Sequence, residues 1–178
     1  MVQTRHAEGQ ALIESCIVIG LICLLLMGLF QLAQLFMARE ILDYAAGRGA
    51  RAKAVGFNDF MVDKIVRIGA IANAGIMTFP EQLDAGPLAQ SAIERARIPL
   101  YLGADRHNQL DSILNYEEWP NLVIGYTSSD IVLNFEVSQD MPIRFFPRLF
   151  GAFYASETVP MKGIVAMDNH YPLYLQEP

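Results

Sequence analysis

The hydrophobic pattern of this chain is dominated by one long apolar stretch near its N-terminus. Between Glu14 and Arg39 no residue carries a formal charge. At about 1.5 Å per helical residue, this stretch is long enough to cross a hydrocarbon core of roughly 30 Å. The pattern therefore predicts a transmembrane helix over residues 15–38. We expect this helix to begin at Gln10, after a short polar segment over residues 1–9 that has no periodicity.

A cleaved secretory signal is the main alternative for an apolar stretch at this position. Such signals usually have an apolar region of about 7–15 residues followed by a small-residue cleavage site. Here the apolar stretch continues as far as Ala38, and Arg39 and Glu40 follow at once. We therefore predict that the helix is retained.

The pattern beyond Arg39 predicts that the same helix continues out of the membrane. Residues 40–55 are rich in alanine, with charges interleaved, which favours a helix that runs on into water and ends near Gly56. The N-terminal helix would then cover residues 10–56 and leave residues 57–178 as one soluble domain. Asn58 offers N-cap chemistry for a second helix at the start of that domain.

The middle of the chain shows weaker signals. Glycine and proline predict a loop over residues 75–88. We expect a short amphipathic helix from Leu88 to Arg97 that ends before Pro99, and a further helical piece at about residues 105–114.

The C-terminal part has the pattern of a β-sheet. Residues 122–127 and 131–137 are rich in β-forming residues and are separated by a hairpin-like spacing. Residues 141–154 are apolar but interrupted by proline and glycine, which predicts a packed crossover. Residues 157–167 form a last strand, in which Pro160 indicates an edge position or a bulge. Helices followed by an antiparallel sheet give an α+β fold.

One face of the apolar helix differs from the rest of its surface. Small, sulfur-bearing and amide side chains recur there at steps of three and four residues, whereas the other faces carry mostly leucine, isoleucine, valine and phenylalanine. This small-residue stripe consists of Cys16, Gly20, Cys23, Met27, Gln31, Gln34 and Ala38. Such a stripe favours helix–helix contact in a bilayer. The alternative is a chance alignment.

Charge and cysteine content exclude several functional classes. The formal net charge of −6 and the pI near 5.0 argue against a nucleic-acid partner, because phosphate binding needs a basic surface. Both cysteines lie in the apolar stretch, and their Cα atoms would be roughly 10 Å apart on a helix, too far for a disulfide. The cysteines therefore supply neither a disulfide framework nor a thiolate metal site.

The sequence also lacks recognisable catalytic motifs. It has no Gly-x-Ser-x-Gly, phosphate-binding loop or His-Glu-x-x-His motif. The segment from Asp105 to Asp111 contains His107, but the spacing does not place these three side chains on one helix face. We predict that the protein is not an enzyme and uses neither metal nor cofactor.

Basic residues in the segment 47–53 leave the orientation open. They suit contact with anionic lipid head groups as well as a simple solvated helix face. Because they follow the apolar stretch, the positive-inside rule taken alone places this segment in the cytoplasm.

Glu14 is the most informative single residue. The helix dipole favours an acid in the first turn, which is one explanation for it. Deeper in the bilayer an ionised carboxylate is costly unless it is paired. Cleavage after Gly9 would give Gln10 a free ammonium group, on this subunit or on a neighbour, that could pair with Glu14.

The sequence Gly9-Gln-Ala-Leu-Ile-Glu14 before an apolar helix resembles the prepilin signal of type IV pilins and pseudopilins. Residues 11–14 and 28–36 narrow the resemblance to TadE-like pseudopilins of the tight-adherence (Flp) pilus system, and the strands at 132–137 and 155–167 are similar to the end of that family. The resemblance implies that a prepilin peptidase cuts between Gly9 and Gln10 and that Glu14 acts in subunit assembly.

The resemblance also implies partners and a location. The partners are the prepilin peptidase, other pilin or pseudopilin subunits through the N-terminal helix, an inner-membrane assembly platform and membrane lipid. The protein would be a minor pilin that primes, tips or seeds an adhesive pilus, with its leader in the bacterial cytoplasm and its domain in the periplasm. The alternative is an uncleaved single-pass inner-membrane protein whose periplasmic domain binds an envelope partner.

Overall fold

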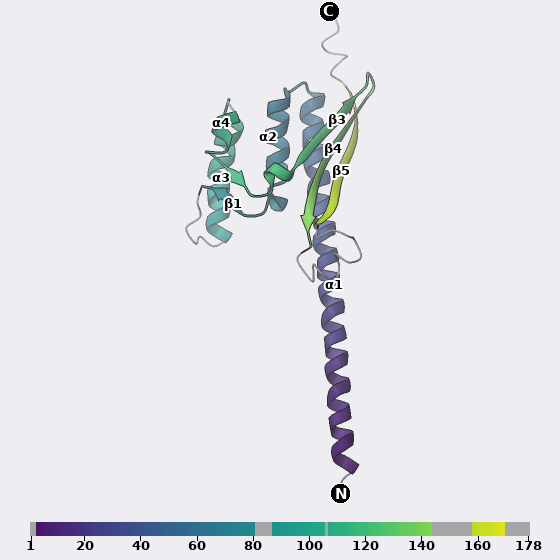
Figure 1. The fold of residues 1–178 in the computed structure, drawn as a ribbon. Helices are drawn as coiled ribbons and strands as arrows, with labels where there is room; N and C mark the ends of the chain where they lie inside the picture. Colours follow the sequence, from purple (N-terminus) through teal and green to yellow (C-terminus); the bar gives the residue numbers. More distant parts are fainter. Residues whose placement is uncertain (1–2, 81–86, 106, 144–157, 170–178) are drawn as a thin grey trace, which may run out of the picture.

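A single long helix organises the computed structural model of the protein (Figure 1). The structure describes residues 3–80, 87–105, 107–143 and 158–169, without the side chains of residues 3–9, 87, 107 and 108. Helix α1 runs from Gln3 to Ala54 over 52 residues. Its first half extends away from the rest of the chain, and its second half forms the centre of an α+β domain (Figure 1).

The helix is continuous across the predicted membrane exit, as the sequence indicated. Its start at Gln3 lies earlier than the expected start at Gln10, so the prediction that residues 1–9 lack regular structure is wrong for residues 3–9. It ends close to the predicted position, and Gly56 follows it with a φ of 94°, a conformation that favours glycine.

Helix α2 (Asp59–Gly69) packs along the second half of α1. Its predicted N-cap is confirmed, because the Asn58 side chain accepts a hydrogen bond from the backbone N–H of Met61 at 2.9 Å. Small residues allow the two helices to approach closely: a Cβ added to Gly69 would lie 3.0 Å from the Cα of Ala45.

A three-stranded antiparallel sheet covers the other side of α1. Strands β3 (Val123–Ser128), β4 (Val132–Pro142) and β5 (Thr158–Asp168) follow one another in the order β3-β4-β5. The predicted hairpin and last strand are confirmed, although β4 continues through residues 141 and 142, where a crossover was expected; the rest of that predicted crossover lies outside the described residues. Phe135 and Val137 of β4 are buried in the core between the sheet and the two helices.

Strand β5 is an edge strand, as Pro160 indicated, and α1 shields that edge. Pro160 has no N–H to offer. The backbone N–H of Ile164 donates to the Asp43 carboxylate of α1 at 3.2 Å. The helix therefore provides a hydrogen-bond acceptor for this edge N–H group, as a neighbouring strand would in a wider sheet.

A second, smaller core lies on the far side of α2. It comprises the 3₁₀ turns η1 (Ile71–Asn73) and η2 (Trp119–Asn121), the strand pair β1 (Met77–Phe79) and β2 (Asn115–Tyr116), and helices α3 (Pro87–Gly103) and α4 (His107–Leu110). Trp119 is buried there between Tyr101 and Tyr116, with ring centroids 5.3 and 4.8 Å away.

Three predictions fail in this smaller core. The predicted loop over 75–88 contains β1, which pairs with the distant β2 and so leaves no local signal. Helix α3 continues through Pro99, and the predicted helix at 105–114 is only four residues long. A proline inside a helix costs about 3 kcal/mol. Burial of Tyr101 and the bonds that Lys64 makes at the end of α3 offset this cost.

Lys64 fastens the end of α3 to α2. Its ammonium group is buried and donates to the carbonyl oxygens of Leu102 and Ala104, each at 2.7 Å, while lying 4.4 Å from the ring centroid of Phe60. Burial lowers the pKa of Lys64, with the charge of Asp105 acting against that shift.

Lys64→Met should destabilise the domain by about 2–3 kcal/mol, because it removes two hydrogen bonds from a charged donor and leaves buried carbonyls without a partner. Lys162→Met is the matched control, since the Lys162 ammonium pairs with the exposed Glu136, and should cost no more than about 1 kcal/mol. The measurement is denaturant unfolding in detergent, followed by the fluorescence of Trp119. Equal effects of the two substitutions would contradict the role given to Lys64.

Candidate assembly surface along helix α1

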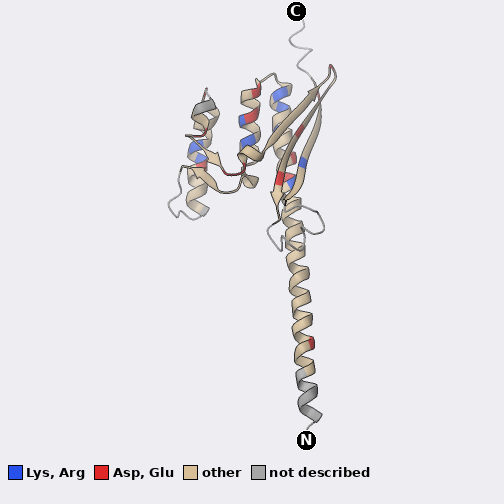
Figure 2. Ribbon diagram, viewed as in Figure 1, with Lys and Arg blue, Asp and Glu red and all other residues tan. Residues whose placement is uncertain are grey.

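The first half of α1 presents a continuous apolar surface. All residues from 10 to 27 are exposed, and most are leucine, isoleucine or valine. Figure 2 shows this part of the helix almost free of charge, in contrast to the domain. Among the described residues, α1 is the one helix long and apolar enough to cross a membrane. Its exposed surface is therefore suited to lipid or to other apolar helices.

The predicted cleavage and assembly residues lie at the start of this surface. Gly9 and Gln10 are consecutive residues in the helical backbone of α1. Glu14 follows one turn later, is exposed, and forms no ion pair within the described part of the chain. Next to it, the Ser15 hydroxyl donates to the backbone carbonyl of Ala11 at 2.8 Å, as serine commonly does within a helix. A carboxylate in this position is open to a partner from another molecule.

The small-residue stripe divides into a free part and a part that contacts the domain. Cys16, Gly20 and Cys23 are exposed, as are Met27 and Gln34. Gln31 and Ala38, by contrast, are only 5% and 2% exposed, because the domain covers them. The structure therefore brings two members of the stripe against the chain itself and leaves five for any intermolecular contact.

A buried polar connection holds the domain to α1 at Ala38. The Asn73 side chain donates to the Ala38 carbonyl oxygen at 2.8 Å, and the Gln139 side chain donates to the Asn73 carbonyl oxygen at 3.1 Å. These bonds join α1, η1 and β4. Nothing in the sequence indicates these bonds, because the three residues are far apart in the chain and none belongs to a motif.

The basic segment 47–53 packs within the domain. The Lys53 ammonium lies 2.6 Å from an Asp59 carboxylate oxygen, which also accepts a hydrogen bond from the Tyr126 hydroxyl at 2.9 Å. The Lys53 hydrogen bond, followed by that of Tyr126, lowers the pKa of Asp59. Burial acts to lower the pKa of Lys53. Its hydrogen bonds to Asp59 and Tyr126 outweigh burial, and the pKa is raised. The Lys53 ammonium group thus has its partners within the protein and needs no lipid head group to pair its charge.

The described residues include no group of three histidine, cysteine, aspartate or glutamate side chains that could hold a metal ion. His107 of the segment considered above has no described side chain. Cys16 and Cys23 are both free thiols. Among the described residues, this surface therefore offers apolar side chains and one carboxylate.

Comparison with known proteins identifies the same segment. A family model described as TadE-like protein matches residues 9–51. No curated protein and no solved structure matches the chain. The matched segment begins at the predicted cleavage glycine, includes Glu14 and the whole small-residue stripe, and ends within the packed half of α1. Over this segment the chain is similar to TadE-like proteins.

Proposed function

We propose that this protein is a minor pilin or pseudopilin of a tight-adherence pilus, cut between Gly9 and Gln10 by a prepilin peptidase. The observation that carries the proposal is the division of α1. One half is an uncovered apolar helix with Glu14 near its start, and the other half is the packed centre of a folded domain. A subunit built in this way can wait in the membrane and later pack its helix against other subunits.

Glu14 gives this packing a register. An unpaired carboxylate in a low-dielectric environment is costly, and an ammonium group on a neighbouring Gln10 would relieve that cost over a short distance. Since such a pairing needs matched heights along the two helices, it selects one axial offset between subunits. The partners in this scheme are other pilin subunits and the inner-membrane platform that moves them.

The proposed orientation places residues 1–9 in the cytoplasm and the domain in the periplasm. The basic residues of segment 47–53 argue against this only through the positive-inside rule, which applies to short loops close to the membrane. Here they belong to a folded domain, and Lys53 pairs with Asp59 at its surface. An alkaline phosphatase fused to the C-terminus should therefore be active; an inactive fusion would contradict the orientation.

Co-expression with a prepilin peptidase should shorten the protein by residues 1–9, as measured by intact mass. Gly9→Ala should prevent this shortening, because the peptidase is expected to recognise the glycine before the cut. Gly20→Ala is the matched control: it changes another glycine of the same helix, where an added Cβ meets no atom within 4 Å, and should leave processing normal.

Full-length mass in the unmodified protein despite an active peptidase would contradict the processing step. It would favour the uncleaved single-pass membrane protein, whose domain binds an envelope partner.

A further inference from the structure

The lower end of the sheet lies beside the middle of α1. Gly163 of β5 packs directly on the α1 backbone at Leu42, and Val165 lies beside Gly47, so β5 and α1 run in the same direction. From Gly163 back to Thr158, the strand descends roughly 17 Å at about 3.3 Å per residue. That descent corresponds to about eleven residues of α-helix.

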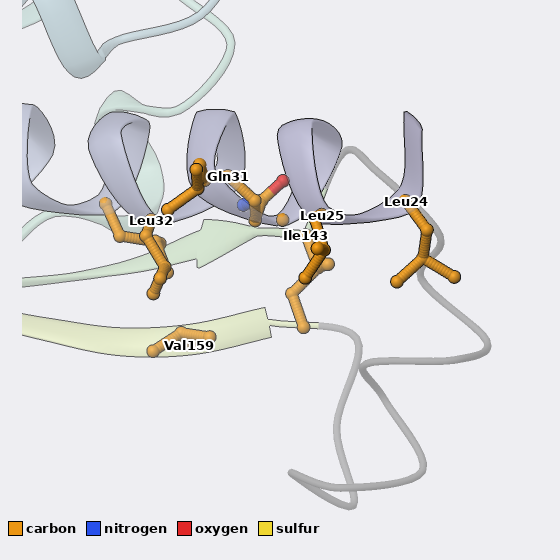
Figure 3. A pocket seen from close by; sticks show the side chains of 9 residues that line it. Leu24, Leu25, Gln31, Leu32, Ile143 and Val159 are labelled. Carbon is orange, nitrogen blue, oxygen red and sulfur yellow. The ribbon is translucent and has the colours of Figure 1, made fainter. Parts of the chain in front are cut away.

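The sheet therefore ends level with Gln31 of α1, well below Ala38. Figure 3 shows the same relation, with Val159 beside Leu32 and Ile143 close to Leu25. A hydrocarbon layer reaching up to Ala38 would enclose about 10 Å of the sheet end. Open strand ends with unpaired backbone groups do not occur in lipid-exposed hydrocarbon. A span over residues 11–30 has the required length of about 30 Å and leaves the strands outside.

An apolar hollow opens where the sheet end meets the helix. Its volume is about 360 Å³. It is lined by Leu24, Leu25, Gly28, Leu29, Gln31, Leu32 and Leu35 of α1, together with Ile143 and Val159 (Figure 3). Gln31 contributes the single polar side chain of this lining. The hollow therefore straddles the level at which the sheet ends, and its lower part continues the lipid-facing surface of α1.

We propose that this hollow holds the acyl chain of a phospholipid from the leaflet nearest the domain, with the hydrocarbon boundary at Gln31. The proposal rests on the membrane-anchored state described under the proposed function. A polar ligand would find almost no hydrogen-bonding partner in the hollow. A second helix about 10 Å wide, running along this face, would meet Ile143 and Val159. A flexible acyl chain can enter from the hydrocarbon below.

The test uses the full chain with Cys16→Ser and Cys23→Ser, reconstituted in vesicles of phosphatidylcholine and phosphatidylglycerol. Val159→Cys is labelled with a bimane fluorophore, and acyl chains brominated near their middle serve as the quencher. We expect quenching at position 159 to be several-fold stronger than at Ile164→Cys. Position 164 is a matched control, because it lies higher on the same strand and is 61% exposed.

Leu21→Cys, below the hollow, separates failure of this inference from failure of membrane anchoring. Quenching at position 21 but not at 159 would overturn the lipid-filled hollow and leave the anchored state intact. No quenching at position 21 would contradict the anchored state itself. Oxidation of the Val159→Cys protein to a disulfide-linked dimer, together with weak quenching, would identify a second copy as the occupant and would also overturn the inference.

Discussion

Glu14→Ala should abolish incorporation of this protein into the pilus while leaving its membrane insertion intact. Insertion depends on the apolar surface, which is long enough without Glu14. In the proposed assembly, by contrast, incorporation depends on the one carboxylate within the exposed helix, which has no ion-pair partner among the described residues. The measurement compares the amount of protein in sheared filaments with the amount in the membrane fraction, by immunoblot.

Two further variants separate charge from shape. Glu14→Gln keeps the size of the side chain and one acceptor oxygen but removes its charge, and should fail as fully as alanine if an ammonium group is the partner. Ser15→Ala is the neighbouring control: it removes only the hydroxyl bond to the Ala11 carbonyl and should incorporate normally. Normal piliation with the Glu14→Ala protein would rule out the assembly role of Glu14.

The local elements of the fold were predictable, because their signals lie within a few residues of the structure they specify. Asn58 directly precedes α2 and caps its N-terminus. The β-rich runs around residues 122–137 pair as a hairpin, and Pro160 lies in an edge strand. The apolar stretch lies in the long helix, and the TadE-like family model matches residues 9–51, which include Gly9 and Glu14.

What the sequence did not reveal depends on distant contacts. Strand β1 exists because β2, nearly forty residues later, pairs with it. Pro99 stays within α3, whose end is held by Lys64 and by the burial of Tyr101. In the candidate site, spacing alone gave Gln31 and Gln34 the same role, but the domain covers only Gln31. Helical periodicity shows which residues share a face and cannot show where a folded domain will cover it.

At Gly163 the sheet packs directly on the backbone of α1. It is buried in β5, and a Cβ at this position would overlap the backbone atoms of Leu42 and Asp43 in α1. Backbone atoms of a packed helix cannot move aside as the end of a flexible side chain can. The same contact places the Asp43 carboxylate where it accepts the N–H of Ile164.

Gly163→Ala should therefore cost about 3 kcal/mol of unfolding free energy, at the upper end for an overpacked core, because β5 must move off the helix and lose the Asp43 bond. Gly125→Ala is the matched control in β3, where an added Cβ meets no atom within 4 Å, and should change stability by no more than about 0.5 kcal/mol. Denaturant unfolding in detergent, followed by Trp119 fluorescence, measures both.

Equal midpoints would show that the sheet can shift without loss of stability. A lower midpoint for Gly163→Ala alone would show that this contact ties the domain to the helix. Membrane insertion should be unchanged, because the exposed apolar half of α1 lies outside this contact.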